Sequence, residues 1–415
     1  MKRRVVVTGI GAITPVGNDV ATTWQSLCEG KSGTAAITRF DASKFPVRIA
    51  GEVKGFDPLT YMDRKEAKRA DPYTQYAVGA SWQAMRDAGL VDKPEVDSDR
   101  IGVIIGSGIG GLKSFEEQHD VYRERGPGKI SPFFIPMFIA DIASGIVSMQ
   151  FNARGPNYAT VSACSTSAHA IGDAFRTIQY GDADVMITGG AEATVTPMAI
   201  GGFANMKALS ERNDSPETAS RPFDITRDGF VMGEGSGVII LEELEHARAR
   251  GAKIYGEVAG YGATGDAFHL TSQPEEHEGL QRSMKRALND AGLTPADIDY
   301  VNAHGTSTPL NDSNEAKAIA RVFGDEARKV NISSTKSATG HMLGAAGATE
   351  FIISLLAIRD QVVPPTINLT QVDPECGDLN FTAICAQKRK VRAALSNSAG
   401  FGGHNVTLAV KAFEG

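Results

Sequence analysis

Cysteine is scarce in this sequence, and so are long apolar runs. The 415 residues include four cysteines, which are scattered along the chain: Cys28, Cys164, Cys376 and Cys385. This scatter excludes a disulfide framework and gives no zinc-binding spacing, so we expect no metal site. No apolar stretch approaches the roughly 18 residues that cross a membrane. The start, MKRRVVVTGIGAITPVG, is too interrupted by glycine and proline for a signal peptide. It predicts a first strand at residues 4–8, and we expect a cytoplasmic protein.

The chain also lacks an excess of positive charge. Lysine and arginine total 42 against 49 acidic residues, for a net charge of −7. This balance argues against general nucleic-acid binding, although it leaves room for local basic patches. The length and the 42% hydrophobic content suffice for a large core of two or three domain-sized units.

What the chain does contain is a strand–turn–helix–strand pattern around one cysteine. Residues 158–162 favour a strand, Cys164 follows among small residues, and an apolar face then recurs at helical spacing until Gly181. A second strand is expected at residues 185–188. Cys164 would therefore lie at a helix N-terminus, where free N–H groups and the helix dipole favour a thiolate and can hold an oxyanion. A buried structural cysteine is the alternative interpretation.

Strand-like and helical segments alternate along the chain, which predicts an α/β architecture. One helix is expected at residues 71–88. Further strands are expected at these ranges: 100–105, 236–241, 255–259, 299–302, 330–334 and 405–411.

An internal repeat then predicts two copies of one α/β unit. AMRDAGL at residues 84–90 returns as ALNDAGL at 287–293, and both copies precede a strand and a glycine-containing loop. The opening strand also recurs, with Gly-x-Gly-Ala at residues 9–12 and 260–263. We expect the halves to be residues 1–252 and 253–415, with the site at their junction.

Three loops in the second half follow predicted strands and carry polar groups. The first, at 300–309, offers His304, and the second, at 334–341, offers Lys336 and His341. The third is the glycine-rich segment around Phe401. Cysteine together with histidine at strand ends indicates nucleophilic catalysis, although a structural role is the alternative for any single histidine. GSGIGG at 106–111 resembles a dinucleotide-binding loop, but the segment after it gives no such unit, and no compact ligand pair supports zinc.

Four motifs in this order resemble the elongating β-ketoacyl-acyl carrier protein synthases of the thiolase superfamily. They are SACSTSAHA, NAHGTSTPLND, KSATGHMLGAAGATE and GFGGHN, with RPFDITRDGFVMGEG between the first and second. The resemblance spans the chain and is closest to the type II enzyme of bacterial fatty-acid synthesis. It implies the thiolase fold, with duplicated halves in five αβαβα layers, and a homodimer.

The resemblance also implies the reaction. Acyl carrier protein would deliver an acyl chain to the cysteine and then malonyl groups for decarboxylative condensation, with no cofactor besides the carrier's phosphopantetheine. The ketosynthase of an aromatic polyketide system is an alternative. A non-catalytic chain-length factor is disfavoured, because Cys164 is present.

The roles implied for single residues follow from the same motifs. Cys164 would be the nucleophile, its N–H and that of Phe401 would form the oxyanion hole, and His304 and His341 would stabilise the enolate. Lys336, balanced by Glu350, would hold the histidines. The other expected contacts are Thr306 and Thr308 with phosphopantetheine, and Ile109, Ala399 and Gly402 with the substrate.

One position departs from the family pattern. The pattern Asn-Ser-Phe-Gly-Phe-Gly-Gly leads one to expect phenylalanine at position 399, where this chain has alanine. Phe401, the expected gate over Cys164, is retained between glycines that let its loop move. We expect Ala399 to loosen this gate.

An acidic carrier protein requires a basic patch on this acidic chain. Lys65, Lys68 and Arg69 are predicted to share one helix face at i, i+3, i+4 spacing. Lys129 and Arg212 are the further candidates for carrier docking.

Overall fold

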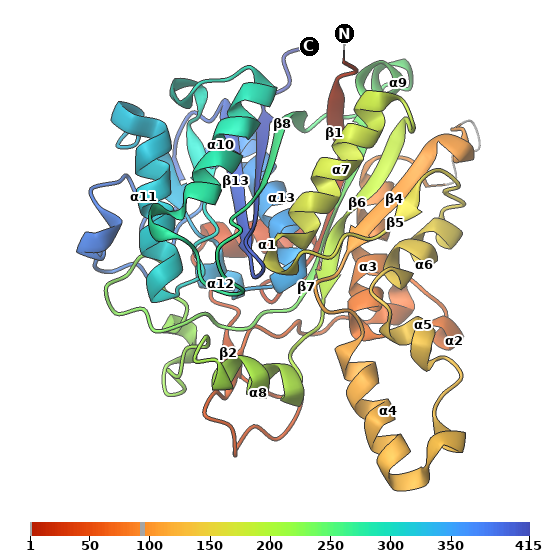
Figure 1. Ribbon diagram of the computed structural model, residues 1–415. Helices are drawn as coiled ribbons and strands as arrows, with labels where there is room; N and C mark the ends of the chain where they lie inside the picture. The colour runs from red at the N-terminus through yellow and green to blue at the C-terminus, as the bar shows by residue number, and fades with distance from the viewer. Residues whose placement is uncertain (1, 92–95) are drawn as a thin grey trace.

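A computed structural model describes residues 2–91 and 96–415, and its centre is one ten-stranded sheet (Figure 1). Five strands come from the first part of the chain: β1 (Val5–Ile13), β4 (Ile101–Gly106), β5 (Asn157–Tyr158), β6 (Val185–Glu192) and β7 (Gly235–Glu243). Five come from the rest: β8 (Gly256–Gly265), β9 (Tyr300–Asn302), β10 (Asn331–Ser333), β13 (Ala393–Gly400) and β14 (His404–Lys411).

The strand order repeats, so the duplication expected from the sequence is confirmed. From the middle outward one half runs β1-β7-β6-β4-β5 and the other β8-β14-β13-β9-β10. The first three strands of each half pair antiparallel and the outer ones parallel. The halves meet where β1 and β8 pair antiparallel, Val5 opposite Val258. The boundary after residue 252 stays a prediction.

Helices cover both faces in the five-layer order that was expected. Between the two halves of the sheet lie α7 (Thr166–Tyr180) and α13 (Ala346–Asp360), whose apolar side chains form one core with β1, β7, β8 and β14. Outside the first half lie α3 (Pro72–Asp87) and α6 (Ile142–Gln150), and outside the second α10 (Glu278–Ala291) and α11 (Pro309–Phe323). Figure 1 shows α7 and α13 side by side between the strands.

The repeated sequence makes the same contact in both halves. A Cβ at Gly9 would lie 2.2 Å from the carbonyl oxygen of Ala84, and one at Gly260 would lie 2.2 Å from that of Ala287. A side chain at either glycine would therefore push its helix off the strand. The Gly-x-Gly strand and the Ala-Gly-Leu helix end are two parts of one packing unit.

The remaining elements are short or peripheral. The helices are α1 (Val20–Cys28), α2 (Arg64–Ala67), α4 (Leu112–Arg125), α5 (Phe134–Phe138), α8 (Pro197–Asn205), α9 (Leu244–Ala249) and α12 (Lys336–Thr339). The strands are β2 (Ala35–Ala36), β3 (Ile49–Ala50), β11 (Val362–Val363) and β12 (Gln387–Lys388). Across residues 2–91 and 96–415, no helix combines the length and the apolar character needed to cross a membrane.

Two local expectations are wrong. The strand before Cys164 ends at Tyr158, because the chain then turns into the site. The helix that begins at Arg64 ends at Ala67, so Lys68 caps it and Arg69 lies beyond it. Lys65, Lys68 and Arg69 therefore do not lie together within one helix.

Candidate active site

Cys164 lies in a tight turn at the N-terminus of α7. The turn is a 3-10 segment, Ala163–Ser165, entered through a left-handed backbone at Ala163 with φ of 50°. Helix α7 follows directly and ends at Gly181, whose left-handed conformation caps it as expected. Gly400 packs closely against this turn. A Cβ at position 400 would lie 3.2 Å from the Cys164 nitrogen, so a larger residue has no room there.

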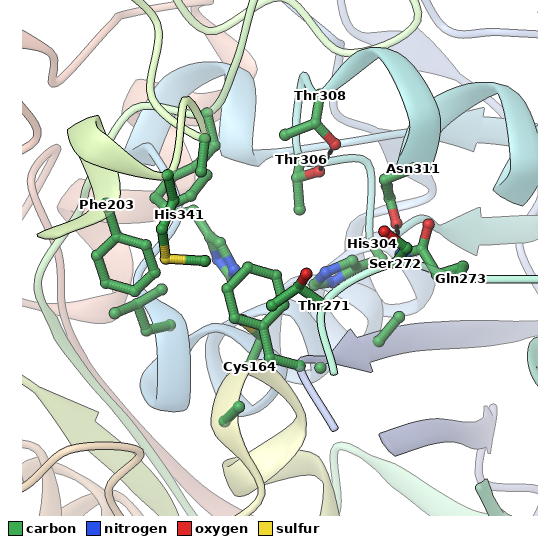
Figure 2. A pocket seen from close by; sticks show the side chains of 18 of the residues that line it. Cys164, Phe203, Thr271, Ser272, Gln273, His304, Thr306, Thr308, Asn311 and His341 are labelled. Carbon is green, nitrogen blue, oxygen red and sulfur yellow. Dashed lines mark hydrogen bonds between the residues drawn. The ribbon is translucent and has the colours of Figure 1, made fainter. Parts of the chain in front are cut away.

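A cavity of about 500 Å³ brings most of the predicted site residues together. Cys164, His304, His341, Thr306, Thr308, Ile109, Ala399 and Phe401 all line it. Figure 2 shows Cys164 on one side of the two imidazoles and the two threonines on the other. Lys336 and Gly402 are absent from the cavity wall. The Cys164 half and the histidine half of the chain therefore meet in one site.

The two histidines stand perpendicular to one another and are neutral. Their ring centroids lie 5.4 Å apart at an interplanar angle of 85°. Burial, reinforced by the nearby Lys336 ammonium, holds both imidazole pKa values well below 6.5. Within the described residues, both ring nitrogens of His341 and Nδ1 of His304 have no hydrogen-bond partner. A neutral imidazole can donate one hydrogen bond, so each ring can serve an oxygen in the cavity.

Lys336 is buried, its charge acts on both imidazoles, and it forms an ion pair with Glu350 of α13. Burial raises the pKa of Glu350 to about 7, and the Lys336 ammonium opposes that shift. The lysine therefore acts on the site through its charge, which keeps protons off the two imidazoles.

A second buried carboxylate, Glu315 of α11, fixes the His304 loop. Its oxygens accept the backbone N–H of His304 at 2.8 Å and that of Gly305 at 2.7 Å. The side-chain amide of Asn397 on β13 donates to it as well, at 3.3 Å. The sequence analysis missed Glu315, although it lies only three residues beyond the NAHGTSTPLND motif.

The thiol of Cys164 does not have the lowered pKa that its helix N-terminus led us to expect. Burial raises the pKa to about 12, against the opposing effects of Lys336 and of the N–H groups of Phe401 and Cys164 itself. The dipole at the start of one helix is worth less than the loss of solvent around the sulfur. The resting cysteine is therefore a thiol.

The loop around Phe401 is hydrogen-bonded on one side to residues 266–270. The N–H of Gly402 donates to the Leu270 carbonyl at 2.7 Å, and the N–H of Asp266 donates to the Gly403 carbonyl at 2.9 Å. Asn405 donates its side-chain N–H to Asp266 at 2.6 Å. Gly402 thus ties this loop to Leu270 and does not line the cavity.

The basic residues predicted for carrier docking differ in their exposure and in their contacts. Lys65, Lys68 and Lys129 are exposed. The Arg69 guanidinium lies 3.9 Å from the centroid of the Phe133 ring. The Arg212 guanidinium donates to the Thr226 carbonyl at 2.5 Å and lies 3.6 Å from the Asp228 carboxylate. It is therefore already paired with an acidic residue of its own chain.

Several residues on the cavity wall were missed by the sequence analysis: Phe203, Met206, Lys207, Asp266, Thr271, Ser272, Gln273 and Asn311. Asn311 lies within the NAHGTSTPLND motif and could have been named from it. Phe203 and Met206 come from α8 and its end, where the sequence carries no signal of chemistry.

Two family models match successive parts of this chain. The Beta-ketoacyl synthase N-terminal domain matches residues 2–247, and the Beta-ketoacyl synthase C-terminal domain matches residues 255–370. The chain belongs to the beta-ketoacyl synthase family.

Relatives in this family are similar along their whole length. The 3-oxoacyl-[acyl-carrier-protein] synthase 2 of Synechocystis sp. is 54% identical, over 100% of this chain and 99% of its own. The protein of the same name from Staphylococcus aureus is 53% identical over 99% of both chains. A beta-ketoacyl synthase structure from Burkholderia phymatum has 36% identity and a TM-score of 0.93 over 100% of both chains, which confirms the fold.

Ala399 lies on β13 at the cavity wall, two residues before Phe401, and its small side chain leaves space there. Ala399→Phe should fill that space and restrict the movement of Phe401. We expect the acylation rate with long acyl donors to fall by roughly tenfold relative to short donors, because a hydrophobic pocket discriminates between acyl chains by the volume that it leaves for them. Competition among short, medium and long donors, read by intact mass, measures this ratio.

The control is Ala399→Ser, which adds little volume and should keep the original chain-length profile. Identical profiles for the wild-type chain and Ala399→Phe would show that position 399 does not control the gate.

Proposed function

We propose that this chain catalyses decarboxylative Claisen condensation of an acyl chain with malonyl-acyl carrier protein, giving 3-oxoacyl-acyl carrier protein in fatty-acid elongation. One observation carries the proposal: a buried cysteine at a helix N-terminus shares a cavity with two neutral imidazoles. The names of the relatives with 53–54% identity agree with it. No cofactor is required, since the phosphopantetheine arm arrives on the carrier.

In the first half-reaction Cys164 takes up the acyl group. The sulfur attacks the carbonyl carbon of the acyl thioester, the carbon–sulfur bond to phosphopantetheine breaks, and the departing sulfur receives the thiol proton. The N–H groups of Cys164 and Phe401 stabilise the oxyanion of the tetrahedral intermediate. Since burial favours the neutral thiol, proton loss accompanies the attack.

In the second half-reaction the malonyl group loses carbon dioxide. The electron pair of the broken carbon–carbon bond passes to an enolate, whose thioester oxygen accepts hydrogen bonds from His304 and His341. The enolate carbon then attacks the Cys164 thioester, a new carbon–carbon bond forms, and the cysteine sulfur leaves as a thiolate. A proton from solvent returns it to the thiol. Thr306 and Thr308, whose hydroxyls are hydrogen-bonded at 2.9 Å, lie where the phosphopantetheine arm would enter.

A role in fatty-acid elongation is favoured over polyketide synthesis by the degree of similarity. The ishigamide ketosynthase/chain length factor is 33% identical with a TM-score of 0.93. A ketosynthase solved in complex with its type II polyketide acyl-carrier protein is 35% identical. Both cover 100% of this chain yet have lower identity than the 3-oxoacyl-[acyl-carrier-protein] synthases.

The decisive experiment separates the two half-reactions. Cys164→Ala should abolish acyl transfer and condensation yet keep malonyl-carrier decarboxylation, because the two histidines remain. That decarboxylation should stay constant from about pH 8 to about pH 6, since both imidazoles are neutral above their lowered pKa values. Product masses and carbon dioxide release are the measurements.

His304→Ala is the matched variant, and it should lose decarboxylation while Cys164 still accepts acyl groups. A Cys164→Ala chain that condenses normally, or one that loses its thermal stability along with its activity, would refute the assigned role of the cysteine.

We propose that the carrier docks on the exposed lysines. Reversal of charge in Lys65→Glu together with Lys68→Glu should raise KM for carrier-bound substrates by roughly tenfold at low salt and weaken its salt dependence. Lys285→Glu with Lys390→Glu, two exposed lysines on the second half, is the control. Unchanged low-salt kinetics in the first pair would exclude this patch.

We also propose a cytoplasmic homodimer. Residues 115–161 carry many large exposed apolar side chains, which supports a second copy of the chain as the partner at this surface. These side chains are Phe115, Tyr122, Ile130, Phe133, Ile135, Ile139, Met149, Tyr158 and Val161. Light scattering should give twice the chain mass for the wild type and the single mass for Ile135→Asp. A monomeric wild type would contradict the dimer.

A further inference from the structure

Glu192, the last residue of β6, is a fully buried carboxylate on the cavity wall to which the proposed reaction gives no role. Its Oε1 accepts hydrogen bonds from the Ser107 hydroxyl at 2.9 Å and from the N–H of Ile109 at 3.2 Å. Its Oε2 accepts from the N–H of Gly108 at 2.8 Å and from the N–H of Gly344 at 3.0 Å. One side chain therefore joins two loops that are distant in the sequence.

Every partner of this carboxylate is a donor. The Ser107 hydroxyl oxygen itself accepts the N–H of Gly110 at 3.0 Å, so its hydrogen is available for Glu192. Two oxygens that each accept two hydrogen bonds match an ionised carboxylate and no other side chain of this length. Burial acts against that form and raises the pKa of Glu192 to about 7, while these hydrogen bonds lower it.

The two loops that Glu192 joins both shape the substrate cavity. One carries Ile109, whose side chain lies on the wall. The other is the turn Leu343–Ala345, two residues after His341, and Leu343 also lines the cavity. They touch directly, since a Cβ at Gly344 would lie 2.5 Å from the Gly108 nitrogen.

We propose that Glu192 is a positioning residue which fixes the Ile109 loop against the Leu343–Ala345 turn and thereby sets which acyl chains Cys164 accepts. The inference rests on the proposed condensation and assigns Glu192 no contact with the reacting atoms. With the carboxylate intact, Ile109 stays in place and limits the depth of the cavity. Once the loop is released, Ile109 can withdraw and longer chains enter.

Glu192→Gln tests this with almost no change of shape. The amide replaces one oxygen with an NH₂ group, which can only donate. In one orientation that group faces the N–H groups of Gly108 and Gly344 and loses two of the four hydrogen bonds. In the other it loses the Ile109 N–H, and the Ser107 hydroxyl has to turn to accept from it. We expect the ratio of long-donor to short-donor acylation to rise by about tenfold, because hydrogen bonds to a charged group are among the strong ones.

The measurement is competition between carrier proteins loaded with short and with long saturated chains, with acyl-Cys164 read by intact mass. A ratio is independent of the fraction of folded enzyme. Ser107→Ala removes a single donor and should shift the ratio in the same direction by less, which keeps the test valid if Glu192→Gln folds poorly.

Glu52→Gln is the matched control. Glu52 is also buried and accepts the N–H groups of Thr38 at 2.9 Å and Arg39 at 3.1 Å, but it does not line the cavity. This variant should keep the wild-type ratio. An equal shift in Glu52→Gln, or an unchanged ratio in Glu192→Gln, would overturn the proposal.

Failure of the inference and failure of the proposed function are distinguishable. A wild-type chain that accepts no acyl donor contradicts the condensation itself. A wild-type chain that condenses while Glu192→Gln keeps its chain-length ratio contradicts the role of Glu192 alone.

Discussion

The antiparallel pairing of β1 with β8 is the constraint on which the site depends. It joins the two halves of the sheet edge to edge, so the sheet wraps around α7 and α13. Cys164 precedes α7 and Gly344 precedes α13, each in a 3-10 turn entered through a left-handed backbone. The duplication thus places two equivalent turns face to face. One of them carries Cys164, the proposed nucleophile, and the other follows His341.

Burial then decides the protonation of the site. The Cys164 thiol and the two imidazoles are each held in the neutral form, chiefly because they have lost solvent. Formal charge is carried by the buried carboxylates Glu192 and Glu315, which accept several hydrogen bonds, by the Lys336–Glu350 pair, and by Lys207 and Asp266 on the cavity wall. A cavity with neutral donors suits a reaction in which negative charge develops on thioester oxygens, because fixed dipoles then respond to it without reorganisation.

Much of this architecture was predictable because it depends on short sequence motifs. The repeated Ala-Gly-Leu helix ends and Gly-x-Gly strands predicted two equivalent units, and the contacts of Gly9 and Gly260 give the physical reason. Predictions failed where a tertiary contact replaced a local preference. The strand before Cys164 is cut short at Tyr158, and the helix at Arg64 ends after one turn, so Lys65, Lys68 and Arg69 do not share one helix.

The sequence by itself determined which residues are the candidates for the chemistry, since a cysteine among small residues before a helix and histidines in glycine-rich strand-end loops are local arrangements. Tertiary structure alone decided how those residues meet and behave. The pKa of Cys164 depends on the exclusion of solvent by segments that are distant in the sequence. The hydrogen bonds of Glu192 join residues 107–109 with residue 344. Desolvation and long-range hydrogen bonds depend on residues that only folding brings together, so they cannot be read from any single stretch of sequence.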